Sequence, residues 1–396
     1  MRYLAVYDKK MQQIWSFLGI YCEYNSMLPE TNVSVFDHPE FDQHESVNFF
    51  DDPRSGLRTI VAVHSTALGP AAGGCRRWTY ASDDIALTDV LRLSRGMTYK
   101  NAVAGLPFGG GKAVILATEK TPKSTQMFEA FGRAVESLNG RYITAEDVGI
   151  SVDDMRIVRG VTRFVSGLPQ SGNGAGGDPS PWTALGVFQG IKAAAAARLG
   201  TKSLEGLRVA VQGVGHVGVY LCRMLHEAGA KLVIADVNNP SLRSVCETMP
   251  AELASPQDIL FSDVDVLAPC ALGNVLNAET IPRIRAKIVA GAANNQLATA
   301  ADGARLADLG ILYAPDYVIN AGGVISVAHE YLGQSSEQQV RAEVSRIPLR
   351  LRDIFAEAAE RGLPTNVLAD DLARRIVENG RKNNEMTESA DARLIA

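Results

Sequence analysis

The sequence predicts an α/β protein built from two domains. Its 396 residues suffice for two or three domains that each bury a core. Apolar segments of strand length alternate with amphipathic helical segments along most of the chain, a pattern typical of sheets covered by helices. A segment rich in glycine, serine and proline, 167–181, separates two regions of different pattern, and we interpret it as a flexible crossing between domains.

The region before this crossing contains two predicted strands and two predicted helices. Residues 57–64 are apolar and β-branched, which predicts a buried strand. The segment 82–103 has apolar residues at helical spacing after a serine and two aspartates, which predicts a capped amphipathic helix. A second strand, 112–117, follows three glycines directly, and a second helix covers 124–138.

The region after the crossing alternates between strands and helices. We expect strands at 207–212, 231–236, 264–268 and 288–290, with a helix at 216–228 between the first two. This alternation indicates a parallel sheet covered on both faces. The C-terminal part is helical in pattern, and we expect it to pack back across both halves.

Composition argues against several classes of protein. Lysine and arginine total 39 against 44 acidic residues, and a net charge of -5 is not typical of a dedicated binder of nucleic acid or anionic membranes. We find no run of about 18 apolar residues that would predict a membrane span, and no signal-peptide pattern. The five cysteines are scattered without a C-x-x-C pair, which argues against a disulfide framework or a metal site and favours the cytoplasm.

A glycine fingerprint for a dinucleotide lies between a predicted strand and a predicted helix. It has the form G-x-G-x-x-G and consists of Gly213, Val214, Gly215, His216, Val217 and Gly218. The first glycine permits a tight turn, the second lets the backbone approach a pyrophosphate, and the third lets the helix pack on the sheet. Asp236, at the end of the next strand, can accept hydrogen bonds from the ribose and would repel a 2′-phosphate, so we favour NAD over NADP. The alternative is a glycine-rich turn in another α/β protein, and we interpret His216 as a variable residue beside the phosphates.

Two lysines form the more unusual feature of the first region. Lys100 ends a predicted helix, and Lys112 follows three glycines, which are typical of a phosphate cradle or of a close approach to the backbone. The spacing and the lack of Ser or Thr after Lys112 exclude a Walker A loop. In one dry cleft, repulsion and desolvation would leave one lysine neutral as a general base, while the other pairs with a substrate carboxylate. Surface lysines are the alternative.

A short loop, 144–149, presents two acids after a predicted strand. These are Glu146 and Asp147, in the sequence TAEDVG. One of them can carry protons to and from a substrate amine. An aspartate that only caps a helix is the alternative.

Eight stretches of the chain resemble one family of enzymes, in the same order along residues 35–385. They are LGPAAGGCR (68–76), LRLSRGMTYKNAVAGLPFGGGK (91–112), NGRYITAEDVG (139–149), GDPSPWTALGV (177–187), VQGVGHVG (211–218), APCALG (268–273), GAANNQL (291–297) and YAPDYVINAGGVI (313–325). The sequence resembles the glutamate/leucine/phenylalanine/valine dehydrogenases, and among them the leucine and valine enzymes most. The resemblance implies oxidative deamination of an L-amino acid by NAD and water, giving a 2-oxo acid and ammonium.

The resemblance also implies roles for residues at the reaction centre. Lys100 would hold the substrate α-carboxylate, helped by the backbone at Gly73 and Gly74. Lys112 would be the lysine of low pKa that activates water, and Asp147 the proton carrier at the substrate nitrogen. Such a site stabilises the carboxylates and oxyanions of each stage.

The nicotinamide and the substrate side chain would have their own partners. By the same resemblance, Asn320 and Asn295 would position the nicotinamide end, with Thr183 nearby, and Asn320 would also contact the substrate. Glutamate enzymes carry a lysine at the position of Ala72 and a serine at that of Val327. Both residues are apolar here, and a second carboxylate would be buried without a partner, which disfavours glutamate. Leucine-type enzymes carry a larger residue where Ala72 stands, so an aromatic substrate stays open.

These features predict four regions in an enzyme with a Rossmann-type NAD domain. Residues 1–34 are an extension without an assigned role, 35–170 an α/β domain for substrate binding, catalysis and oligomerisation, 171–325 the NAD domain, and 326–396 helices that bridge the two. We expect a homo-oligomer that acts on leucine, valine or isoleucine, with no nucleic-acid or membrane partner. Phenylalanine dehydrogenase is the alternative enzyme, and a non-catalytic NAD-binding protein is the alternative from another class. The hypothesis requires that Lys100 and Lys112 share one crevice in which Lys112 is neutral.

Overall fold

The computed structural model describes residues 34–118, 121–168, 178–333 and 336–395, and the chain forms two compact units, 1–42 and 43–396. The described part of the first unit contains one short 3-10 helix, η1 (Val35–Asp37), where Phe36 packs edge-on against Phe41. Both sheets belong to the second unit. Within the described ranges, no helix is long and apolar enough to cross a membrane.

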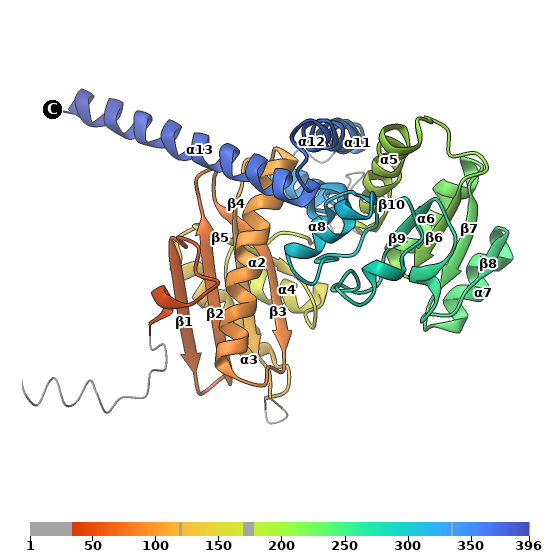
Figure 1. Ribbon diagram of the computed structural model, residues 1–396. Helices are drawn as coiled ribbons and strands as arrows, with labels where there is room; N and C mark the ends of the chain where they lie inside the picture. Colours follow the sequence, from red (N-terminus) through yellow and green to blue (C-terminus); the bar gives the residue numbers. More distant parts are fainter. Residues whose placement is uncertain (1–33, 119–120, 169–177, 334–335, 396) are drawn as a thin grey trace, which may run out of the picture. The chain divides into compact units, whose positions relative to one another are not determined.

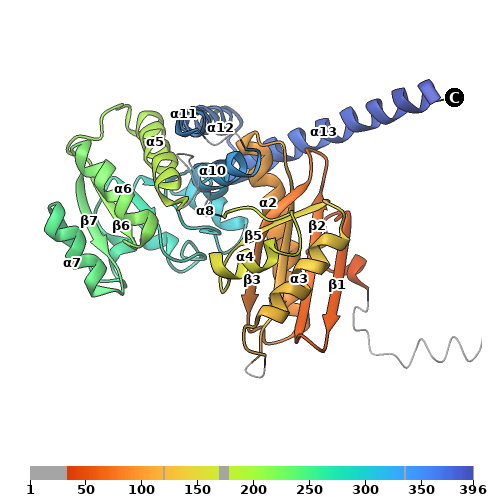
Figure 2. The same ribbon diagram turned by 180° about the vertical axis from the view of Figure 1, so that it is seen from behind.

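The first sheet has five strands in the order β1-β2-β4-β3-β5 (Figure 1). The strands are β1 (Ser46–Asp52), β2 (Leu57–Ser65), β3 (Ala71–Trp78), β4 (Gly109–Leu116) and β5 (Tyr142–Glu146). Strand β2 runs antiparallel to both of its neighbours, β1 and β4, whereas β3 runs parallel to both β4 and β5. Helix α2 (Asp83–Ala104) packs on one face, and α3 (Thr125–Ser137) and α4 (Val152–Arg159) cover the other (Figure 2). The predicted strand 57–64 and the two predicted helices are confirmed.

The three glycines before Lys112 belong to β4, which therefore starts earlier than the predicted strand 112–117. A Cβ on Gly110 would lie 2.0 Å from the backbone nitrogen of Thr98 in α2, and one on Gly109 would lie 1.8 Å from the carbonyl oxygen of Ser65 in β2. The glycines therefore let α2 and the neighbouring strand approach β4 closely. This is the close-approach alternative for the glycine run, and it brings the end of α2, with Lys100, next to Lys112.

The second sheet has six parallel strands in the order β11-β10-β9-β6-β7-β8. They are β6 (Arg208–Gln212), β7 (Lys231–Ala235), β8 (Ala251–Leu253), β9 (Val266–Pro269), β10 (Ile288–Val289) and β11 (Leu312–Tyr313). Strands β7 and β8 lie on one side of β6, and the chain then crosses over to place β9, β10 and β11 on its other side. This is the doubly wound, Rossmann-type order. The four predicted strands of this region are confirmed, and β8 and β11 extend the sheet beyond them.

Helices complete this half of the molecule. They are α5 (Ser180–Leu199), α6 (His216–Glu227), α7 (Asn239–Thr248) and α8 (Ala301–Asp308), with the 3-10 helices η2 (Ile259–Phe261) and η3 (Ile281–Arg283). The predicted crossing 167–181 lies largely outside the described residues, which resume at Asp178, just before α5.

The C-terminal helices pack back across both sheets, as expected. They are α9 (Asp316–Ile319), α10 (Gly322–Tyr331), α11 (Glu337–Val344), α12 (Ile347–Arg361) and α13 (Thr365–Ile395). Helices α10 and α12 pack on α5, while α13 packs on α2. Arg374 of α13 donates a 3.1 Å hydrogen bond to the hydroxyl of Tyr99 in α2, directly before Lys100.

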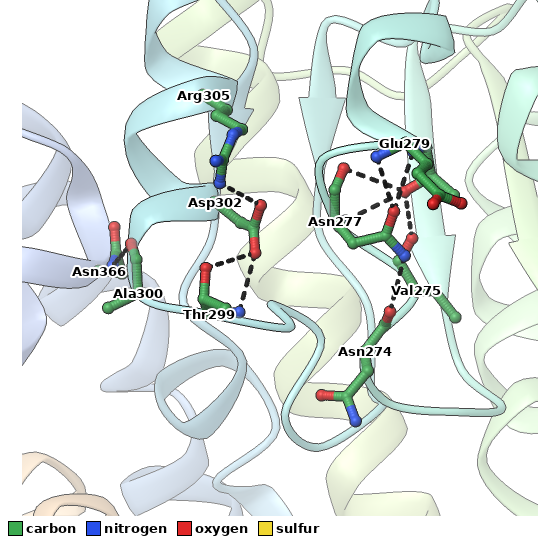
Figure 3. A network of polar contacts seen from close by, with 10 residues as sticks. Asn274, Val275, Asn277, Glu279, Thr299, Ala300, Asp302, Arg305 and Asn366 are labelled. Carbon is green, nitrogen blue, oxygen red and sulfur yellow. Dashed lines mark hydrogen bonds and ion pairs between the residues drawn. The ribbon is translucent and has the colours of Figure 1, made fainter.

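The first turn of α13 is joined to α8 by a polar network (Figure 3). Asn366 donates a 3.1 Å hydrogen bond to the carbonyl of Ala300. The buried carboxylate of Asp302 accepts 2.8 Å bonds from the backbone and the hydroxyl of Thr299 and from Arg305. The bonds to Asp302 tie the first turn of α8 to Thr299, and the bond from Asn366 ties the first turn of α13 to Ala300.

Candidate active site

A cavity of about 360 Å³ is lined by residues from both halves of the chain. Its walls come from β3, α2 and β5 on one side and from α5, α6 and α10 on the other. Many of the residues predicted from the sequence line it: Ala72, Gly73, Lys100, Thr183, Val217, Asn320 and Val327. The structure therefore brings together the substrate residues of the first region and the nicotinamide residues of the second.

Lys100 lies half-buried on the cavity wall, at the end of α2. Burial lowers the pKa of its ammonium to about 8, Asp316 raises that pKa, and the neighbouring Lys112 lowers it further. Its Nζ donates a 3.4 Å hydrogen bond to the side-chain oxygen of Asn294. Lys100 is thus an ammonium group on the cavity wall whose pKa, about 8, lies close to neutral pH.

Lys112 and Asp147 form an ion pair beside the cavity. The Nζ of Lys112 lies 2.6 Å from Oδ2 of Asp147, and Lys112 is only 6% exposed. Asp147 follows β5 and lies against Gly74 of β3, where a Cβ would be 2.9 Å from the Cβ of Asp147. Gly74 therefore has a packing role: it lets the acidic loop approach the lysine.

The two lysines have different surroundings, and the expectation of a neutral Lys112 stays a prediction. Lys112 lies 2.6 Å from a carboxylate oxygen, whereas burial lowers the pKa of Lys100. The two lysines do share one region, because each feels the other's charge. The sequence shows that two lysines meet, but not which of them the acid contacts.

Asp147 is held ionised by two cations. Burial raises the pKa of its carboxyl, but Lys112 and Arg76 lower it by more, so the net change is downward. Arg76 comes from β3, and its Nε lies 3.6 Å from the same Oδ2. Arg76 in turn pairs with Asp89 of α2 at 2.9 Å.

Arg76 and Asp89 were not predicted from the sequence. A signal for Arg76 is present, because a strand places every second side chain on the same face and Arg76 is two residues after Gly74. A charged residue at that position in a strand of small residues is directed toward the loop that Gly74 accommodates. No comparable pattern singles out Asp89 on its helix.

The two neighbouring asparagines of GAANNQL lie differently. Asn294 lines the cavity, and its side-chain oxygen accepts hydrogen bonds from Lys100 and, at 2.8 Å, from Asn320. Asn295, the residue expected at the nicotinamide, is exposed, has a positive φ of 51° and is not on the cavity wall. Asn294, and not Asn295, therefore lies on the cavity wall. A repeated residue at a turn cannot be resolved from sequence alone.

The glycine fingerprint has the geometry that a dinucleotide needs. Gly213 has a φ of +94°, and a Cβ on Gly218 would lie 2.1 Å from the carbonyl oxygen of Gly213, so α6 packs closely on the turn. A Cβ on Gly215 would meet nothing within 4 Å, which leaves space above the helix N-terminus for a phosphate. The half-buried Asp236 accepts a 2.8 Å hydrogen bond from the backbone of Val214. His216 is the exposed first residue of α6.

Another part of the cavity wall is apolar. It includes Ala72, Val324, Val327 and an edge-to-face pair, Phe108 and Tyr331, with ring centroids 5.9 Å apart. Such a wall can bind an aliphatic or aromatic side chain and offers no cation to a second carboxylate.

Comparisons with known proteins agree with this geometry. A sequence model of the Glu/Leu/Phe/Val dehydrogenase dimerisation domain matches residues 44–164, and one of glutamate/leucine/phenylalanine/valine dehydrogenase matches 177–239 and 242–369. The chain is 48% identical to leucine dehydrogenase of Bacillus subtilis, over 89% of this chain and 96% of that protein. It is 43% identical to phenylalanine dehydrogenase of Bacillus thermotolerans, over 88% and 92%. The crystal structure of L-tryptophan dehydrogenase from Nostoc punctiforme has a TM-score of 0.76 at 45% identity, covering 86% of this chain and 97% of that chain.

Proposed function

The chain belongs to the glutamate/leucine/phenylalanine/valine dehydrogenase family, and from that premise we propose that it catalyses the reversible, NAD-dependent oxidative deamination of branched-chain L-amino acids. The products are a 2-oxo acid and ammonium. The observation that carries the proposal is the meeting of Lys100, Asn320 and an apolar wall in one cavity, with the Lys112–Asp147 pair beside it.

The cofactor is a nicotinamide dinucleotide, and its form is NAD. The fingerprint Gly213–Gly218 would hold the pyrophosphate and Asp236 the adenosine ribose, where a 2′-phosphate would be repelled. Thr183, Asn294 and Asn320 line the cavity where the nicotinamide end would lie. When bound, the cofactor supplies the hydride acceptor.

The residues of the cavity orient the substrate. The Lys100 ammonium pairs with the α-carboxylate, and the carboxylate in turn stabilises the charged form of this half-buried lysine. Asn294 is fixed by its bond from Asn320 and holds Lys100 in place. The backbone at Gly73 lies on the same wall and can donate to the carboxylate.

The Lys112–Asp147 pair handles protons. Asp147, held as a carboxylate, accepts a proton from the substrate ammonium, so that the amine lone pair is available when the Cα–H bond breaks. Protonation of Asp147 removes the charge that stabilises the Lys112 ammonium, while Lys100 remains nearby. Lys112 can then release its proton to solvent water, and the neutral amine accepts a proton from the water that attacks the iminium carbon.

The apolar wall selects the substrate side chain. Ala72, Val324 and Val327 suit a branched aliphatic group and disfavour glutamate. Aromatic amino acids are the second candidate, because Ala72 is small and the Phe108–Tyr331 pair can pack against a ring. A few methylenes change such a preference by only about 1–3 kcal/mol, so we expect overlapping substrates.

A substrate panel tests this proposal. Purified protein is mixed with NAD⁺ and, in turn, L-leucine, L-valine, L-isoleucine, L-phenylalanine, L-tryptophan or L-glutamate at alkaline pH, and NADH absorbance is followed. We expect the highest kcat/KM with a branched-chain substrate and none with glutamate. A higher value for phenylalanine or tryptophan would favour the aromatic alternative, and NAD binding without turnover would favour a non-catalytic protein.

We also propose that the protein is a homo-oligomer. The match to a dimerisation domain supports this proposal, and light scattering measures the mass of the assembly.

A further inference from the structure

We propose that Arg76, anchored by Asp89, is a positioning residue that holds the Asp147 carboxylate in its charged form and in its orientation toward Lys112. This inference rests on the proposed function, because it assigns Arg76 a part in the proton chemistry of Asp147. It does not require that Arg76 contact the substrate, and Arg76 is not among the residues that line the cavity.

Arg76 is fixed from one side by a two-pronged contact. Its Nη1 donates to both carboxylate oxygens of Asp89, at 3.2 and 2.9 Å, and the hydroxyl of Tyr80 donates to Asp89 at 2.7 Å. The side chains of Arg76 and Asp89 are each 25% exposed. Because Nη1 contacts Asp89 and Nε lies near Asp147, the planar guanidinium is held at two of its edges.

The second of these edges faces Asp147. The Nε of Arg76 lies 3.6 Å from Oδ2 of Asp147, the oxygen that also lies 2.6 Å from Nζ of Lys112. Two cations, from the neighbouring strands β3 and β4, therefore converge on one oxygen of one carboxylate. Both contacts restrict rotation of the carboxylate about its Cβ–Cγ bond.

The two cations have different chemistry. Lys112 can lose its proton, whereas an arginine stays charged throughout the pH range of a working enzyme. Arg76 therefore keeps its positive charge beside Asp147 throughout the proposed cycle, also after Lys112 has lost its proton. Together with Lys112, Arg76 thus lowers the pH at which Asp147 takes up a proton.

Other groups around Asp147 contribute to the same balance. Charged and titratable groups from four elements and one loop act on Asp147 or on Arg76. They are Lys100 and Asp89 of α2, Cys75 of β3, Tyr80 just after β3, Lys112 of β4 and Tyr142 of β5. Burial raises the pKa of the Asp147 carboxyl, and Lys112 and Arg76 outweigh it. Removal of Arg76 deletes a positive charge, so the pKa of Asp147 must rise.

The alternative role for Arg76 is purely structural, as a link between β3 and α2 through Asp89. The two roles can be separated by variants that keep one property at a time. Arg76→Gln is neutral but can still donate a hydrogen bond to Asp89, whereas Arg76→Lys keeps the charge and loses the planar fork. Arg77→Gln is the matched control, because Arg77 is the next residue of β3 and its side chain bonds instead to the carbonyl of Thr121.

The first measurement is the pH profile of kcat/KM for L-leucine and NAD⁺. Asp147 must be ionised to accept a proton, so activity falls at low pH as it becomes protonated. We expect Arg76→Gln to move this acid limb upward by about 1 pH unit and Arg76→Lys to restore most of the shift, with Arg77→Gln matching the wild type. An acid limb that stays in place in Arg76→Gln, or that moves equally in Arg76→Lys, would overturn the proposal.

A second measurement does not depend on activity. The Asp147 carboxyl carbon is titrated by ¹³C NMR in protein labelled at aspartate, with its signal assigned by Asp147→Asn. Its midpoint should rise in Arg76→Gln and not in Arg77→Gln, and an unchanged midpoint would contradict the inference. If the wild type turned over no substrate of the panel, the proposed function would fail while this titration still decided the role of Arg76. Arg76→Met serves the same titration if Arg76→Gln does not fold.

Discussion

The charge of Lys100 changes close to neutral pH, because burial lowers the pKa of this ammonium to about 8. A lysine that binds a carboxylate does so only when it is protonated. Above its pKa the free protein loses the positive charge, and the affinity for a carboxylate falls. The burial of Lys100 near the end of α2 therefore determines the pH range in which this residue can bind a carboxylate.

We therefore predict that the 2-oxo acid derived from leucine binds the NADH complex more weakly as the pH rises above 8. The Kd, measured by calorimetry, should be level at lower pH and rise by up to about tenfold per pH unit above the pKa. Lys100→Met should bind weakly at every pH, while Lys202→Met, at an exposed position, should follow the wild type. A wild-type Kd that stays constant up to pH 10 would show that Lys100 does not bind the carboxylate.

The residues that sequence could identify are those with an unusual pattern around them. Lys100, Lys112 and Asp147 stand in recognisable stretches, and the structure brings them close together. Their ionisation could not be predicted, because it depends on which lysine contacts the acid. That Asn294 rather than Asn295 lines the cavity could not be predicted either, since the turn decides which of two identical neighbours reaches it.

At the scale of elements, the contact between α2 and β4 determines the site. Gly110 makes it possible, because any side chain there would meet the backbone of Thr98, two residues before Lys100. An added methyl group would have to push α2 away from the sheet. The glycine run therefore positions Lys100 without touching the substrate.

We predict that Gly110→Ala destabilises the protein by about 1–3 kcal/mol or more and abolishes most activity. Gly96→Ala is the matched control on α2, where an added Cβ would meet nothing within 4 Å. Because alanine favours a helix over glycine, this control should be stabilising by about 0.5–1 kcal/mol. Urea unfolding and kcat/KM measure both effects. Equal stability of the two variants would mean that α2 can move away from β4 without cost.

Elements with clear periodicity were predicted well, and those made of small residues were not. Strand β3 (Ala71–Trp78) begins with two alanines and two glycines, which have low strand propensity, yet it is paired on both sides. Its glycines are needed because Met97, Gly111 and the acidic loop lie close to them. Tertiary packing thus overrides the local preference. The edge strand β1 has a mixed pattern and was also missed.

At the scale of the whole molecule, the parallel sheet could be predicted because strand–helix alternation allows few other arrangements. The mixed order of the first sheet depends on pairings between distant strands, for which a single sequence holds little signal. The boundaries at 35–170, 171–325 and 326–396 stay a prediction. What joins the two sheets is a shared apolar core, which includes Val103 of α2, Ile191 of α5, Ile325 of α10 and Leu368 of α13.

A shared core predicts that the two sheets unfold together. Trp78 lies at the end of β3, and Trp182 lies in α5. Two variants each keep one of these tryptophans and have the other one and Trp15 replaced. The fluorescence of each variant then reports on one half of the molecule. In denaturant, the two fluorescence transitions should coincide. Leu368→Ala removes a side chain that is 1% exposed in this core and should lower the free energy of unfolding seen by both probes by about 2–5 kcal/mol.

Leu349→Ala is the control for this experiment, because Leu349 lies on α12 with 46% of its surface exposed. It should leave both transitions within about 0.5 kcal/mol of their original position. If Leu368→Ala shifted only the Trp182 transition, the first sheet would be stable without α13 and the core would not be shared. Coincident shifts would instead mean that α13 transmits stability to both walls of the cavity, so that substrate binding at Lys100 and cofactor binding at the glycine fingerprint would stabilise one cooperative unit.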